Sequence, residues 1–194
     1  NPAVTHDELV AELRPMQLLA ISGSLRAGSS NTAVLEAARL VAPAAVEEFL
    51  YQGLAALPAF NPDQDTLERG SLPPEAVDLR TRVGRADGIL VCSPEYAHGI
   101  PGSLKNLLDW LVGSVEFPGK PVALISASSR SVHVQAQLLE VLTTMSARLV
   151  AQASVVLAIP PGTTGAEAIA ADADLAAVLQ GALAAMATAI NAGE

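Results

Sequence analysis

Cysteine is nearly absent from this sequence: Cys92 is the only one among 194 residues. An intrachain disulfide is therefore impossible, and this cysteine usage fits a reducing compartment. Basic residues are also scarce, because 11 lysines and arginines stand against 20 aspartates and glutamates, and the formal net charge is −9. Since nucleic acids and anionic membranes bind clustered positive charge, neither is an expected partner.

Long apolar runs are missing too, although 51% of the residues are hydrophobic. No stretch is long enough and free enough of charge to predict a membrane span, and much of the apolar fraction is alanine, a good helix former. No secretory signal is recognised, so a cytoplasmic location is expected. The length favours one domain, with residues 1–15 as an N-terminal extension and residues 16–194 as the domain.

A polar, glycine-containing stretch is the most informative part of the sequence. It covers residues 21–31, between the apolar run that begins at residue 16 and the helix-like pattern 32–41. The first N–H groups of a helix lack partners and the helix dipole is positive there, which favours an anion. Arg26 adds a planar fork of donors that can grip phosphate. The stretch therefore predicts a phosphate cradle; the alternative is a helix N-cap of serine and asparagine without a ligand.

Several familiar nucleotide and hydrolase motifs are absent. Gly23 and Gly28 have the spacing of a Walker A loop, but Ser29 stands where its lysine would reach the phosphates, which argues against a nucleoside triphosphate. Leu25 replaces the second glycine of the dinucleotide-binding fingerprint. No Gly-x-Ser-x-Gly elbow occurs, so a serine hydrolase is not expected. A single phosphate suits the stretch best.

Apolar strand patterns alternate with helical patterns along the whole chain. Strands are predicted at residues 16–22, 46–51, 88–93, 121–126 and 149–159. Helices are predicted at residues 31–41, 75–86, 103–111, 132–145 and 172–190. Such alternation is typical of an α/β domain with a parallel sheet and helices on both faces. Polar loops follow the first, third and fourth strands, so all three lie at the carboxyl edge of the sheet and can converge on one site.

Two motifs together resemble the NADPH-dependent FMN reductase family. They read Gly23-Ser24-Leu25-Arg26-x-x-Ser29-x-Asn31 and Pro94-Glu95-Tyr96, the latter continued by Pro101-Gly102-x-Leu104-Lys105-Asn106-x-x-Asp109-Trp110. The resemblance implies a single three-layer flavodoxin-like domain. Its five-stranded parallel sheet would have the order 2-1-3-4-5, with helices on both faces.

The resemblance also implies FMN as the cofactor, with its phosphate on the first loop. The expected cofactor-binding residues are Ser24, Arg26, Ser29, Ser30 and Asn31 around the phosphate, Pro94, Glu95, Tyr96 and Ala97 along the isoalloxazine ring, and Ser128 and Ser129 at a ring edge. NADPH or NADH would pass hydride to the flavin, and a small-molecule acceptor (flavin, quinone, azo compound or metal oxyanion) would take the electrons in a ping-pong cycle. No catalytic acid or base is expected, because the flavin carries the hydride chemistry.

The alternative to a reductase is a flavodoxin-type electron carrier that binds FMN without nicotinamide turnover. The resemblance implies a homodimer or homotetramer, and Trp110 could be an interface residue or plain core. Ala97 departs from the family, in which many members have asparagine there, and residues 129–133 replace a loop that is often rich in glycine. His6, His98 and His133 show no metal-ligand spacing, so no metal site is predicted. Cys92 is expected to be buried and inert.

Overall fold

The fold is described from a computed structural model, which covers residues 14–66 and 72–193. Most of the expected extension 1–15 lies outside these residues. Arg14, near the end of this extension, is among the described residues. Its guanidinium Nη2 lies 2.6 Å from the carboxylate Oδ1 of Asp87, the residue before the third strand.

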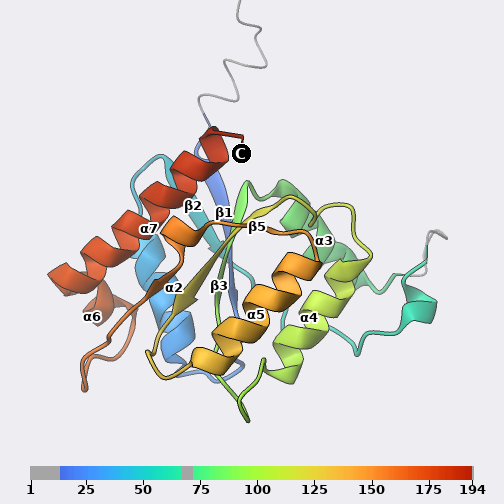
Figure 1. Ribbon diagram of the computed structural model, residues 1–194, viewed down its shortest axis with the longest axis horizontal. Helices are drawn as coiled ribbons and strands as arrows, with labels where there is room; N and C mark the ends of the chain where they lie inside the picture. The colour runs from blue at the N-terminus through green and yellow to red at the C-terminus, as the bar shows by residue number, and fades with distance from the viewer. Residues whose placement is uncertain (1–13, 67–71, 194) are drawn as a thin grey trace, which may run out of the picture.

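The centre of the molecule is a parallel sheet in the order β2-β1-β3-β4-β5, as predicted (Figure 1). Its strands are β1 (Met16–Ser22), β2 (Val46–Leu50), β3 (Gly88–Cys92), β4 (Pro121–Ser126), β5 (Arg148–Leu149) and β6 (Val155–Val156). The strands β3 and β4 are buried at every position, because both of their faces are covered by helices.

Helices cover both faces of the sheet and complete the three predicted layers (Figure 1). On one face lie α2 (Ser30–Val41), α6 (Ala166–Ala171) and α7 (Ala173–Asn191). On the other lie α3 (Pro74–Arg85), α4 (Gly102–Val112) and α5 (Val132–Thr144). Successive side chains of β1 point to opposite faces of the sheet and so belong to two separate cores. Leu18 packs in the core on the α2 side, and Leu19 packs in the core on the α3 side.

The prediction of one continuous fifth strand over residues 149–159 is wrong in detail. Two short strands, β5 and β6, flank a 3-10 helix at Ala151–Ala153, and both pair with β4. The hydroxyl of Ser154 explains the interruption, because its Oγ accepts the Leu124 N–H at 3.1 Å, a bond that a continuous strand would make with a backbone carbonyl. The same hydroxyl donates to the Val150 carbonyl at 3.1 Å.

The expectation that no stretch could cross a membrane needs correction for α7. Its 19 residues, with a mean hydropathy of 1.6, are long and apolar enough by length and composition alone. In the fold, however, Leu179, Leu183 and Met186 of α7 are buried in the core that it shares with α2 and the sheet. The α7 helix therefore serves as part of one of the three layers.

The long segment after β2 is fastened to α4. Asn106 donates from Nδ2 to the Pro58 carbonyl at 2.9 Å and accepts the Phe60 N–H at 2.7 Å. The indole Nε1–H of Trp110 donates to the same Pro58 carbonyl at 2.9 Å, and the indole is fully buried within the chain. Of the two alternatives left open for Trp110, core and interface, the structure supports core.

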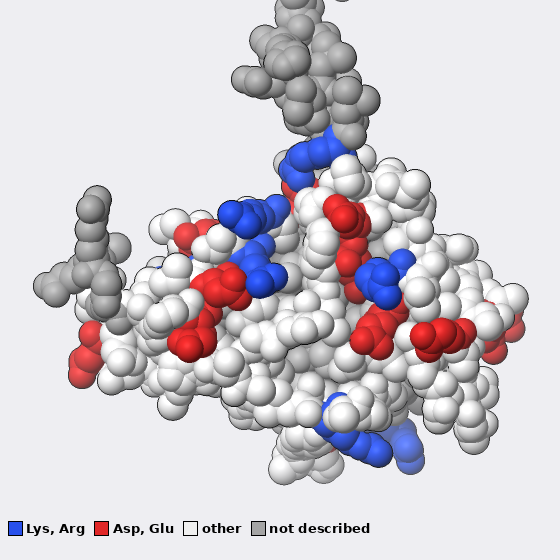
Figure 2. Space-filling model, turned by 180° about the vertical axis from the view of Figure 1, so that it is seen from behind, with Lys and Arg blue, Asp and Glu red and all other residues white. Residues whose placement is uncertain are grey.

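Charged side chains of both signs are mixed on the face shown in Figure 2. Arg80 pairs with Asp65 at 2.7 Å and Arg82 with Asp78 at 2.8 Å. Across the middle of that face basic groups sit beside acidic ones, whereas a few basic groups at its lower edge stand apart from them; the described residues visible there form no broad positive patch.

Candidate functional site

The loops after β1, β3 and β4 meet at the carboxyl edge of the sheet, as predicted. The first two touch through backbone: the Gly23 N–H donates to the Cys92 carbonyl at 2.8 Å. A Cβ atom on Gly23 would lie 2.4 Å from the Ser93 Oγ and 3.0 Å from a Leu104 methyl group. Only glycine therefore allows this close approach of the two loops.

The first loop leaves the start of α2 open to a ligand. Ser29 is the N-cap, and its Oγ accepts the Thr32 N–H at 3.5 Å. The backbone N–H groups of Ser30 and Asn31 make no hydrogen bond with any described residue. Arg26 is exposed, and its guanidinium pairs with no carboxylate in the described ranges. Two free donors thus lie at the positive end of a twelve-residue helix, and an unpaired cation stands four residues before it.

Two other side chains of the first loop are engaged with the protein. Ser24 accepts the Arg26 N–H on its Oγ at 3.2 Å, which tightens the loop. Asn31 is buried, and its Oδ1 accepts from the thiol of Cys92 at 3.4 Å. Burial raises the pKa of this thiol to about 12, which favours the neutral thiol, and Cys92 is buried as predicted.

The second loop contains a tight turn between Tyr96 and Gly99. The two residues exchange backbone hydrogen bonds of 3.1 and 2.9 Å, and both central residues have left-handed backbone, with φ of 48° at Ala97 and 58° at His98. Non-glycine residues adopt this conformation at a cost of roughly 1–2 kcal/mol each. Gln137 of α5 supports the turn, because it donates to the His98 carbonyl at 3.0 Å and accepts the Ile100 N–H at 3.2 Å.

The carboxylate of Glu95 joins the second loop to the third. Its Oε2 accepts the N–H groups of His133 at 2.8 Å and Val134 at 3.0 Å, which are orphan donors at the start of α5. The hydrogen bond from Val134 is the main cause that holds the pKa of Glu95 below its usual value. Sequence reasoning missed this cap, because the partners are 38 and 39 residues apart and no local motif marks it.

The third loop is held by its serines. Ser126 donates from Oγ to the Ser128 carbonyl at 2.8 Å, and the Ser128 Oγ accepts the Arg130 N–H at 3.2 Å. Ser129, the other residue predicted here, is exposed. The structure thus brings the two serines to the edge of the sheet where the first two loops lie.

Each of the three loop regions also exposes a large apolar side chain. Leu25 is 59% exposed, Tyr96 57% and Val132 59%. Exposed apolar groups that gather beside polar ones are typical of ligand-binding surfaces.

Comparison with known proteins identifies the family. The family model for NADPH-dependent FMN reductases matches residues 16–160. The chain belongs to the NADPH-dependent FMN reductase family.

Relatives with named activities match part of the chain. A quinone reductase of Escherichia coli is 36% identical over 119 residues, which are 60% of this chain and 62% of that protein. An NAD(P)H-dependent FMN reductase of Pseudomonas aeruginosa is 38% identical over 117 residues, 59% and 60% of the two chains. The match therefore spans only about three fifths of the length of these curated relatives.

Solved structures extend the likeness to nearly the whole domain. FerB, a flavoenzyme NAD(P)H:(acceptor) oxidoreductase from Paracoccus denitrificans, aligns with a TM-score of 0.80 at 25% identity, over 92% of this chain and 98% of that one. Oxidised flavodoxin 1 from Bacillus cereus aligns with a TM-score of 0.56 at 16% identity, over 89% and 97%. The predicted flavodoxin-like fold is confirmed.

The second family motif divides between the site and the scaffold. Pro94, Glu95 and Tyr96 lie on the second loop, whereas Asn106 and Trp110 hold the segment after β2 and lie within α4. Lys105 and Asp109 form an exposed ion pair of 2.5 Å on another face of that helix. The family motif thus combines residues at the loop edge with residues that brace the fold.

The described residues fit the phosphate of FMN. The N–H groups left free at Ser30 and Asn31 can donate hydrogen bonds to phosphate oxygens, and the unpaired Arg26 guanidinium supplies one positive charge toward an anionic group. Gly28 adds room, since a Cβ on it would meet no atom within 4 Å.

Proposed function

We propose that this chain is an FMN-dependent oxidoreductase that takes hydride from NADPH or NADH and reduces a small-molecule acceptor such as a flavin or a quinone. The observation that carries FMN binding is the open start of α2, where the Ser30 and Asn31 N–H groups have no acceptor among the described residues and Arg26 has no counter-ion. The named activities of the relatives support the reductase assignment.

Each loop has a separate task in this proposal. Arg26 and the first N–H groups of α2 bind the phosphate, supported by the hydroxyls of Ser24, Ser29 and Ser30. When bound, FMN supplies hydride acceptance at its N5 atom and onward electron transfer. The backbone of residues 94–97 lies along the ring, and Ser128 and Ser129 border one of its edges.

In this proposal the second loop orients the ring. The turn at residues 96–99 is held by its own two hydrogen bonds and by Gln137, so it presents a preformed backbone surface. Tyr96 and Val132 add apolar area that a planar ring would cover. No residue of the chain needs to donate or accept a proton for hydride transfer itself.

A homodimer or homotetramer in the cytoplasm also belongs to this proposal. Exposed apolar side chains near the end of α4 support self-association, because Val112 is 64% and Val115 89% exposed. Light scattering of the purified protein tests the oligomeric state, and a monomer at all concentrations would contradict it.

The visible absorption spectrum of the purified protein tests the function. FMN and then NADPH or NADH are added under nitrogen. We expect flavin bands that shift on binding and bleach with nicotinamide, followed by recovery when a quinone is added. Flavin that binds without bleaching would instead indicate a flavodoxin-type carrier, and failure to bind micromolar FMN would overturn the proposal.

Replacement of Arg26 by alanine tests the phosphate cradle. Loss of a charge-assisted contact should weaken FMN binding by about 1.5–3 kcal/mol, or roughly 10- to 150-fold in Kd. Arg85→Ala is the matched control, because Arg85 is exposed on the last turn of α3, which leads into the amino end of β3. An unchanged Kd in Arg26→Ala, measured by fluorescence quenching of FMN, would contradict the assignment.

A further inference from the structure

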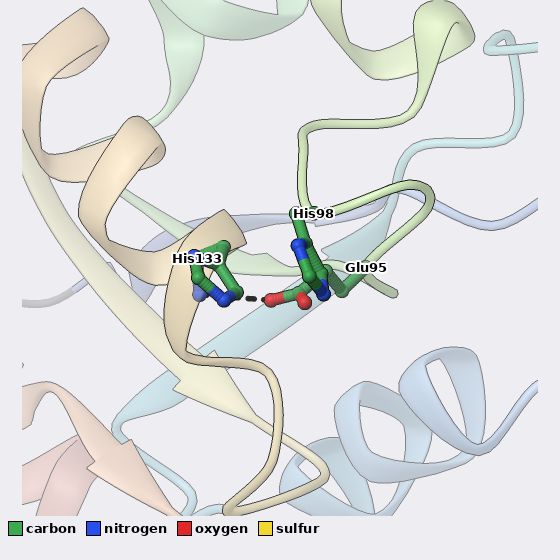
Figure 3. Close-up of side chains that lie close together, drawn as sticks. All are labelled: Glu95, His98 and His133. Atoms are coloured by element: carbon green, nitrogen blue, oxygen red, sulfur yellow. Dashed lines mark hydrogen bonds between the residues drawn. The ribbon is translucent and has the colours of Figure 1, made fainter.

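Glu95 and His98 of the second loop and His133 at the start of α5 form a cluster on the surface (Figure 3). Each of Glu95, His98 and His133 offers one ligand atom, and these atoms all lie within 4.8 Å of one another. The cluster was not apparent from the sequence, where the two histidines are 35 positions apart and show no ligand spacing. The fold unites them because Glu95 caps the helix on which His133 lies.

The backbone around the cluster is held firmly. His98 occupies the second central position of the turn between Tyr96 and Gly99, and its carbonyl is bound by Gln137 of α5. His133 is the second residue of α5, and its N–H is bound by Glu95. These hydrogen bonds therefore join the loop that carries Glu95 and His98 to the helix that carries His133.

The ring nitrogens of both histidines and one carboxylate oxygen of Glu95 have no hydrogen-bond partner among the described residues. Neither imidazole ring makes a hydrogen bond with a residue in the described ranges, and the two rings stack at a centroid distance of 4.1 Å with an interplanar angle of 22°. Glu95 uses Oε2 for its two backbone bonds, which leaves Oε1 available. Both histidines are exposed, so an ion can reach them from solvent.

Two imidazoles and one carboxylate make up a ligand set that Zn²⁺ accepts, with a fourth position left to water. The lone pairs of imidazole lie in the plane of the ring, so two stacked rings cannot both point at one ion. A rotation of the exposed His98 ring about its side-chain torsions would direct its nitrogen toward His133 and Glu95. This rotation leaves the bonded backbone of the turn in place.

We propose that Glu95, His98 and His133 bind one divalent transition-metal ion of the Zn²⁺ type. The site does not depend on the proposed flavin chemistry, because it uses the side chain of Glu95, whereas the proposed function uses the backbone of residues 94–97. It lies on the second loop, beside the backbone that the proposed function places along the flavin ring.

Isothermal titration calorimetry with ZnCl₂ tests the site on the untagged, EDTA-treated protein. We expect one Zn²⁺ ion to bind per chain. His98→Ala and His133→Ala should each weaken binding by about tenfold or more, because each removes one of three ligands. His6→Ala, a histidine outside the described residues, is the matched control and should leave the affinity unchanged.

Circular dichroism and FMN binding of each variant separate a lost ligand from a lost fold. A histidine variant that keeps both and loses Zn²⁺ supports the site. Absence of saturable binding at one ion per chain would overturn the proposal, as would equal affinity in wild type, His98→Ala and His133→Ala. Either result would leave the proposed reductase function untouched, since FMN binding is measured separately.

Discussion

Glu48 of β2 is a carboxyl group buried in the sheet layer. Glu48 is only 4% exposed, and its Oε2 atom has no hydrogen-bond partner in the described part of the chain. Burial raises the pKa of Glu48 to about 8, and the positive charge of Arg39 only partly offsets this effect. At neutral pH the folded protein therefore keeps this carboxyl protonated, whereas the unfolded chain releases the proton.

We expect this carboxyl to make stability fall as pH rises from about 4.5 to 8. In that window the unfolded state binds fewer protons, so the free energy of unfolding declines by at most about 1.4 kcal/mol per pH unit from this group. The glutamine side chain of Glu48→Gln cannot ionise. The free energy of unfolding of this variant minus that of wild type should therefore be larger at pH 8 than at pH 5.5, by about 1–3 kcal/mol. Urea unfolding of both proteins at both pH values measures this difference.

The neighbouring glutamate provides the control for this prediction. Glu47 lies on the same strand, is exposed, and accepts a hydrogen bond from Gln17 at 2.8 Å. Glu47→Gln should show the same difference from wild type at both pH values. If Glu48→Gln behaved in the same way, the buried carboxyl would not be the source of the pH dependence.

At the scale of an element, α4 fastens the segment that follows β2. Asn106 makes two hydrogen bonds to that segment, and the Trp110 ring packs edge-on against Phe60 at 5.0 Å. These contacts explain the asparagine and tryptophan of the family motif as structural residues. They also account for the burial of Trp110, which composition alone could not assign to core or interface.

Asn106→Ala should lower the free energy of unfolding by about 1–3 kcal/mol, because it leaves the Phe60 N–H without a partner and removes one of the two hydrogen bonds to the Pro58 carbonyl. FMN affinity should stay the same, since neither contact reaches the three loops. Thermal unfolding measures the stability, and an FMN titration of the same sample measures the FMN affinity. Lys105→Ala serves as control, because its exposed pair with Asp109 is worth less than about 1 kcal/mol. A loss of FMN affinity without loss of stability would place Asn106 in the binding site.

At the scale of the whole molecule, the sequence predicted the layers and the meeting of the loops. The apolar runs of β1, β3 and β4 and the polar residues that follow them are local signals, and parallel pairing brings their ends together. Contacts that form only after folding had no such signal. The Ser154 hydroxyl that interrupts the last strand, the cap from Glu95 to α5 and the approach of His98 to His133 all join residues distant in sequence.

Ligand binding should stabilise the molecule as a whole if the open start of α2 binds phosphate. FMN at 100 times its Kd adds about 2.7 kcal/mol to the free energy of unfolding, which raises the Tm of a domain of this size by roughly 5–10 °C. Riboflavin has the same ring and no phosphate, so at equal concentration it should raise the Tm less. The difference between the two ligands should shrink in Arg26→Ala, because this variant lacks the guanidinium that meets the phosphate. Equal shifts with FMN and riboflavin in wild type would show that the α2 start and Arg26 do not recognise the phosphate.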